Sequence, residues 1–133
     1  MARILIVDDE EMERMLERTI LEKAGHQLLF ASEGATGLRL CREDDPDLVI
    51  TDLAMRDFNG LRFIRELREA HLYVPLIAVS GWAKDQLDLA REYGADIVLA
   101  KPIDGPTLLD AVERGLALPR LPERMDPWRR VRG

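Results

Sequence analysis

Short apolar runs alternate with amphipathic stretches along most of the sequence. The runs cover residues 3–7, 27–31, 47–51, 74–79 and 96–100. Their apolar residues are nearly continuous, which is typical of strands buried on both faces of a parallel sheet. Parallel strands need helical crossovers between them. The pattern therefore predicts an α/β domain with a five-stranded, doubly wound parallel sheet.

The stretches between the runs have the spacing of amphipathic helices. In the first, Met12, Leu16 and Ile20 form an apolar stripe, while Glu13 and Glu17 fall on other positions of the helix. The other helices are expected at residues 34–43, 60–70, 83–93 and 107–116.

Charge divides the chain into an acidic body and a basic tail. The chain of 133 residues suits a single domain, which we expect over residues 1–118. Residues 119–133 contain three prolines, and five arginines against two acidic residues, so we expect a basic, poorly ordered tail. Its charge of +3, taken from the total of −6, leaves −9 for the body. An acidic body disfavours nucleic acid as a direct partner.

The sequence has no feature of a membrane or secreted protein. No apolar run approaches the ~18 residues that span a bilayer, and the N-terminus lacks a secretory signal. Cys41 is the single cysteine and cannot form an internal disulfide. These observations favour a cytoplasmic location.

Polar residues stand where the expected strands end. Asp8 and Asp9 follow the first strand, Asp52 the third, Ser80 the fourth and Lys101 the fifth. In open α/β sheets, ligands bind beyond the carboxyl ends of the strands, where the strand order reverses. If the first strand lies beside the third, as in the flavodoxin-like order 2-1-3-4-5, the three carboxylates converge in one cleft. Ser80 and Lys101 would flank them.

Such a cleft is suited to phosphoryl transfer. Neighbouring carboxylates raise one another's pKa values unless a cation is present, and Mg²⁺ or Mn²⁺ prefers oxygen ligands. Asp52 would be the nucleophile, Lys101 would neutralise phosphoryl oxygens and Ser80 would donate a hydrogen bond to one of them. Taken singly, each residue has an ordinary explanation as a helix cap or a turn. Their joint placement at four strand ends favours the site.

These residues resemble the response-regulator receiver domains of two-component signalling. The matching motifs are Asp8-Asp9, Asp52 in TDLAM, Gly60 in DFNG, Ser80-Gly81 and Lys101-Pro102, and the resemblance covers residues 3–118. The resemblance implies that Asp52 takes a phosphoryl group from a phosphohistidine on a sensor histidine kinase or a phosphotransfer protein.

The resemblance also implies the metal ligands and the output surface. Asp8, Asp9 and Asp52 would hold Mg²⁺, with the backbone carbonyl of Ala54 as a further ligand. The Lys101–Pro102 peptide bond would be cis. The fourth helix, fifth strand and fifth helix would contact a downstream protein, or a second copy of the chain after phosphorylation.

Three residues depart from the family pattern. Val98 replaces the usual Tyr or Phe three residues before the lysine, and a valine cannot swing a ring inward to report movement of Ser80. Arg56 replaces a proline in the loop after Asp52. Trp82 lies two residues after Ser80, where it could shield the acyl phosphate from water or simply pack against the loop.

Alternative functions remain open at this stage. A receiver that no longer signals through phosphorylation would act as a constitutive binding module. An aspartate-dependent phosphatase would need an acidic residue at position 54, where this chain has Ala54. We expect no enzyme activity beyond self-phosphorylation and slow autodephosphorylation. If the chain is part of a longer protein, an output domain could follow Gly133.

Overall fold

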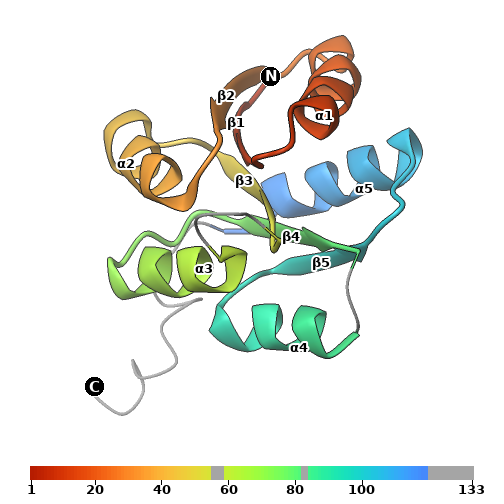
Figure 1. Cartoon of the computed structure of the whole chain (residues 1–133). Helices are drawn as coiled ribbons and strands as arrows, with labels where there is room; N and C mark the ends of the chain where they lie inside the picture. The colour runs from red at the N-terminus through yellow and green to blue at the C-terminus, as the bar shows by residue number, and fades with distance from the viewer. Residues whose placement is uncertain (55–58, 82–83, 120–133) are drawn as a thin grey trace.

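The computed structural model describes residues 1–54, 59–81 and 84–119. Five strands alternate with five helices along the chain (Figure 1). The strands are β1 (Arg3–Val7), β2 (Gln27–Ala31), β3 (Leu48–Asp52), β4 (Leu76–Ser80) and β5 (Ile97–Ala100). The helices are α1 (Glu11–Lys23), α2 (Gly34–Asp44), α3 (Gly60–Glu69), α4 (Lys84–Tyr93) and α5 (Gly105–Leu116).

The strands form one parallel sheet in the order β2-β1-β3-β4-β5, which confirms the predicted fold class. In the central pair, Val7 lies opposite Thr51, and Asp52 in turn lies opposite Val79. The strand ends that carry the candidate residues are therefore level with one another. The strand order reverses between β1 and β3, so the two strands that end in aspartates flank the switch point.

Helices cover both faces of the sheet, and the sheet separates two layers of hydrophobic core. Helices α1 and α5 lie on one face, and α2, α3 and α4 lie on the other (Figure 1). Alternate residues of each strand supply the two layers: Ile4 and Ile6 pack toward α1 and α5, whereas Leu5 and Val7 pack on the opposite side. All four side chains are fully buried, which explains why the central strands read as continuous apolar runs.

Side-chain caps fix where two of the helices begin. The Asn59 side chain accepts a hydrogen bond from the Leu61 amide at 2.7 Å and starts α3 at Gly60, as predicted. The Asp104 side chain accepts from the Thr107 amide at 2.8 Å, so α5 begins at Gly105. The predicted start at Thr107 is two residues late, because Pro106 occupies a first-turn position that tolerates proline.

The apolar stripe of α1 is only partly buried. Met12 is 76% exposed and Leu16 is 59% exposed, whereas Ile20 packs against the core layer that holds Ile4 and Ile6. Glu13, Glu17 and Leu21, which recur every four residues, also lie on the inward side. Because two of these three positions carry carboxylates, hydrophobic periodicity alone does not identify the inward side of this helix.

Some of the sequence predictions lie outside the described residues. They concern Arg56, Trp82 and most of the tail, residues 120–133. Within the described ranges, the helices are too short and too polar to cross a membrane.

Candidate functional site

Two buried aspartates lie side by side at the carboxyl edge of the sheet. Asp8 follows β1 and is 2% exposed, and Asp52 ends β3 and is 6% exposed. Because β1 and β3 pair in register up to Val7 and Thr51, the next residue of each strand reaches the same edge. The predicted convergence of Asp8 and Asp52 in one cleft therefore matches the structure.

Backbone amides hold one oxygen of each aspartate. The Glu10 amide donates to Asp8 Oδ1 at 2.9 Å, and the Ala54 amide donates to Asp52 Oδ1 at 3.0 Å. These hydrogen bonds orient the carboxylates and leave Asp52 Oδ2 turned toward the cleft. The Ala54 amide thus has a defined role at the site, whereas metal coordination by the Ala54 carbonyl stays a prediction.

Gly60 allows α3 to start directly against the site. A Cβ atom at this position would lie 2.3 Å from the Asp52 carbonyl oxygen and 2.5 Å from Leu53 Cα. Both neighbours are backbone atoms of the segment that carries Asp52, so they cannot move aside without displacing the carboxylate. The glycine of the DFNG motif is needed here for close approach.

Lys101 lies beside the carboxylates, as expected, and reaches across the cleft to Asp52. Its Nζ donates to Asp52 Oδ2 at 2.7 Å. It also donates to both carboxylate oxygens of Glu13, at 2.7 Å and 2.6 Å. These three contacts equal the number of N–H donors on a lysine ammonium. The Lys101–Pro102 peptide bond is cis, as the resemblance implies.

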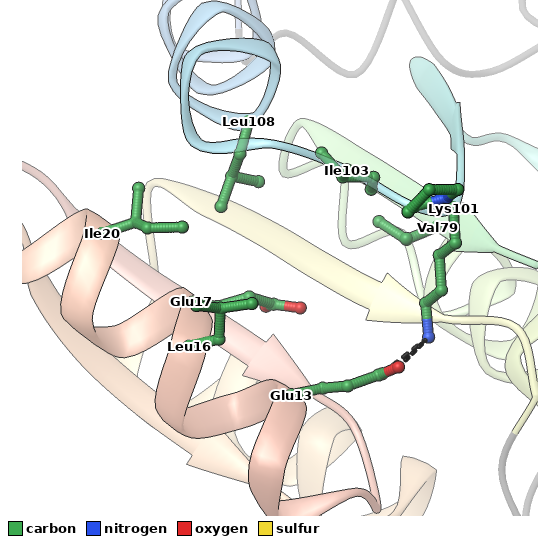
Figure 2. Close-up of a pocket in the computed structure, with 9 residues that line it drawn as sticks. Glu13, Leu16, Glu17, Ile20, Val79, Lys101, Ile103 and Leu108 are labelled. Carbon is green, nitrogen blue, oxygen red and sulfur yellow. Dashed lines mark hydrogen bonds and ion pairs between the residues drawn. The ribbon is translucent and has the colours of Figure 1, made fainter.

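Glu13 is a site residue that the sequence analysis missed. In the sequence it was noted only as lying outside the apolar stripe of its helix, but its side chain points from α1 toward Lys101 (Figure 2). The position of Glu13 in the sequence could have identified it as a site residue. It lies one helical turn beyond Asp9, on the first turns of a helix that starts at the strand end. A side chain placed there can turn back over the cleft.

Oxygen atoms of Asp8, Glu13 and Asp52 all lie within 4.8 Å of one another. Three hard oxygen donors at this spacing fit a divalent cation such as Mg²⁺. Asp9 is half-buried and does not belong to this trio. Its role as a metal ligand stays a prediction.

The charged side chains of the cleft shift one another's pKa values. Burial raises the pKa of Asp8 to about 8, and the negative charges of Asp52 and Glu13 add to this rise. Burial also opposes the charged form of Lys101, but hydrogen bonds to Asp52 and Glu13 outweigh it and raise the Lys101 pKa. For Glu13, burial raises the pKa, but hydrogen bonds to Lys101 and Asp8 together with the positive charge of Lys101 outweigh burial and lower it.

Ser80 and Val98 lie on the neighbouring strands. Ser80 ends β4, is fully buried, and is one residue beyond the partner of Asp52 in the sheet. Its position at this edge agrees with the sequence analysis, while its contact with a phosphoryl group stays a prediction. Val98 pairs with Ala78 and packs against the core beneath α2, α3 and α4.

A cavity of about 390 Å³ opens beside Lys101, between α1 and α5 (Figure 2). Its walls are mostly apolar and include Ile20, Val79 and Leu108. The Glu17 carboxyl points from α1 into this space (Figure 2). Within the described part of the chain, its buried Oε2 has no hydrogen-bond partner, and burial raises its pKa to about 7.

A doubly wound sheet with buried aspartates at its switch point, and a lysine paired to one of them, defines a receiver-type phosphoryl-accepting class of domain. Comparisons with known proteins agree with this class. The family model described as "Response regulator receiver domain" matches residues 4–113. The chain belongs to this family and is a response regulator receiver domain.

Individual relatives show how close the similarity is. Protein PilH of Pseudomonas aeruginosa is 40% identical over 122 residues, covering 88% of this chain and 99% of PilH. The polar-differentiation response regulator DivK of Brucella ovis is 29% identical, covering 83% of this chain and 92% of DivK. A crystal structure of a response regulator receiver domain protein from Clostridium thermocellum superposes with a TM-score of 0.81. It is 31% identical and covers 87% of this chain and 94% of that one.

Proposed function

We propose that Asp52 is the phospho-acceptor and that it takes a phosphoryl group from a phosphohistidine on a sensor kinase or phosphotransfer protein. The observation that carries this proposal is the placement of Asp52 Oδ2. It lies in the cleft 2.7 Å from Lys101 Nζ, within a cluster of carboxylates that can hold a cation. In the transfer, an Asp52 oxygen forms a bond to phosphorus. The bond from phosphorus to the histidine nitrogen breaks, and its electron pair stays on that nitrogen.

The carboxylates gathered at the cleft support the use of a divalent cation in this reaction. Asp8, Asp9, Asp52 and the carbonyl of Ala54 would hold Mg²⁺ or Mn²⁺, which when bound neutralises charge on the phosphoryl oxygens. The chain's own groups do the rest of the positioning. The Ala54 amide orients Asp52, Lys101 supplies a positive charge, and Ser80 donates a hydrogen bond to a phosphoryl oxygen. Autodephosphorylation by water would return the domain to its resting state.

The exposed apolar residues of α1 are the surface that we assign to the histidine-bearing partner. Met12, Met15 and Leu16 are each more than half exposed, and they lie on the helix whose Glu13 reaches the cleft. We expect a partner that brings a histidine to Asp52 to contact this patch. The pair of substitutions Met12→Ser and Leu16→Ser should slow transfer from a phosphorylated histidine phosphotransfer domain that labels the wild-type protein. Labelling by a small phosphodonor should not change.

Phosphorylation is proposed to act through protein contacts. The surface of α4, β5 and α5 is the expected contact for a downstream protein, or for a second copy of the chain. Val98 pairs with Ala78 on the neighbouring strand and packs against the core, so any coupling between Ser80 and this surface through Val98 would be a packing shift rather than the swing of an aromatic ring.

The experiment is intact-mass measurement after incubation with acetyl phosphate and Mg²⁺. Wild-type protein should gain one phosphoryl group, and Asp52→Asn should gain none. Equal labelling of the Asp52→Asn variant would refute the assignment. Absence of labelling in the wild type would favour the constitutive binding module, and repeated turnover of external phosphoesters would favour a phosphatase.

A further inference from the structure

We propose that Glu13 is a positioning residue that holds Lys101 in the resting state, so that the phosphoryl group must compete with Glu13 for the lysine ammonium. This inference rests on the proposed function of Asp52. It deepens that function by naming a residue that sets how strongly the site takes and keeps its phosphoryl group. Nothing in the sequence motifs of the cleft assigns a role to Glu13.

The first support is the number of contacts that Lys101 makes. Its ammonium has three N–H donors. One is directed at Asp52 Oδ2 and two at the Glu13 carboxylate, with all three distances between 2.6 Å and 2.7 Å. The ammonium therefore has no donor left for a phosphoryl oxygen unless it gives up one of these contacts.

The second support is the environment of the pair. About a quarter to a third of each side chain is exposed, so water screens the interaction only in part. Glu13 sits on α1 and Lys101 follows β5, so the ion pair joins two elements on opposite sides of the cleft. Hydrogen bonds between charged groups are stronger than neutral ones, so exchanging a bond from Lys101 to Glu13 for a bond to the phosphoryl group has a cost.

The direction of the effect follows from this competition. With Glu13 in place, Lys101 must weaken its contact with the Glu13 carboxylate before it can bind a phosphoryl group. This cost lowers the net affinity of the site for that group. With glutamine in its place, shape is kept, but the negative charge and one of the two charge-assisted acceptors are lost. Lys101 is then freer to turn to the phosphoryl group. We expect Glu13→Gln to bind a phosphoryl mimic roughly five to ten times more tightly than the wild type.

The test uses the full chain and beryllofluoride as the phosphoryl mimic, with its affinity measured by fluorine NMR at saturating Mg²⁺. The matched control is Glu11→Gln, an exposed carboxylate on the same helix, which should bind like the wild type. A second readout is the side-chain NMR signal of Lys101 in metal-free protein, which should shift in Glu13→Gln and not in Glu11→Gln. Mg²⁺ affinity is measured by calorimetry without beryllofluoride.

A Lys101→Met background separates the lysine-dependent effect from simple charge repulsion. If Glu13 acts through Lys101, the gain from Glu13→Gln should vanish there. An equal gain in that background would overturn the proposal, because Glu13 would then repel the phosphoryl mimic directly. An unchanged beryllofluoride affinity or an unmoved Lys101 signal in Glu13→Gln would also overturn it.

The affinities for Mg²⁺ and for beryllofluoride separate the role of Glu13 from the proposed function of Asp52. A fall in Mg²⁺ affinity of tenfold or more in Glu13→Gln would make Glu13 a metal ligand and overturn its role as a lysine partner, whereas a smaller change leaves that role standing. Failure of the wild type to bind beryllofluoride would refute the proposed function itself. Wild-type binding that is lost in Asp52→Asn, together with unchanged binding in Glu13→Gln, would refute only the role of Glu13.

Discussion

The buried carboxyl of Glu17 makes the stability of this domain depend on pH in a way that a single substitution should remove. Its side chain points into the cavity between α1 and α5, and burial raises its pKa from the ordinary 4.5 to about 7. Burial penalises only the ionised form. Glu17→Gln replaces the carboxyl with a neutral group of nearly the same shape.

The magnitude follows from the two pKa values. In the unfolded chain Glu17 loses its proton near pH 4.5, while the folded protein holds the proton until about pH 7. Proton binding therefore favours the folded state. This contribution is fully present below pH 4.5 and is lost as the pH rises through 7. Each factor of ten in proton affinity is worth ~1.4 kcal/mol, so the loss reaches about 3 kcal/mol.

The assay is urea unfolding followed by circular dichroism, at a series of pH values from 5 to 8. We expect the free energy of unfolding of Glu17→Gln, relative to the wild type, to rise by about 2–3 kcal/mol between pH 5 and pH 8. An effect of the new amide on stability that does not depend on pH cancels when the two pH values are compared. Glu11→Gln, on the exposed side of the same helix, should show no such rise. Parallel pH profiles for Glu17→Gln and the wild type would refute the reasoning.

Three further substitutions test the structural account. Gly60→Ala should destabilise the domain by about 1–3 kcal/mol and slow labelling of Asp52, because the new Cβ meets backbone atoms of that segment; urea unfolding and intact mass would check this, and wild-type behaviour in both would contradict it. Arg68→Ala should cost about 3–5 kcal/mol, because this buried guanidinium binds Asp96 and the carbonyls of three residues; a loss under 1 kcal/mol in urea unfolding would argue against the network. Asp9→Ala should weaken Mg²⁺ binding about tenfold by calorimetry, and an unchanged affinity would remove Asp9 from the metal site.

The fold was predictable because its signals are local and repeated. Continuous apolar runs such as residues 3–7 are typical of strands buried on both faces of a parallel sheet, and such a sheet needs helices on both sides. The strand order did not follow from periodicity. It entered as a condition that would bring Asp8 and Asp52 together, and the observed order satisfies it.

Site residues at the strand ends could be predicted from the sequence, whereas those on a helix were harder to predict. Asp8, Asp52 and Lys101 follow strands, so the sheet alone places them at one edge. Glu13 and Glu17 depend on the rotation of α1 about its axis. The apolar stripe does not reveal this rotation, because two inward positions of α1 face a charged cleft and a partly open cavity rather than a closed core.

The close backbone approach at Gly60 could be recognised in the sequence only through the DFNG motif. Gly60 in DFNG matched the family pattern, but the reason for a glycine is a long-range approach of α3 to the Asp52–Leu53 backbone. Spacing along the chain carries no information about such a contact. It needs the coordinates of both segments.

The central claim is that Asp52 accepts the phosphoryl group in a cation-dependent reaction. Its most direct test is borohydride reduction of protein treated with acetyl phosphate, followed by peptide mass mapping, since reduction converts a phosphorylated aspartate to homoserine. The account predicts homoserine at position 52 alone, present with Mg²⁺ and absent when the metal is chelated. Homoserine at another aspartate, or equal labelling of Asp52 without metal, would contradict it.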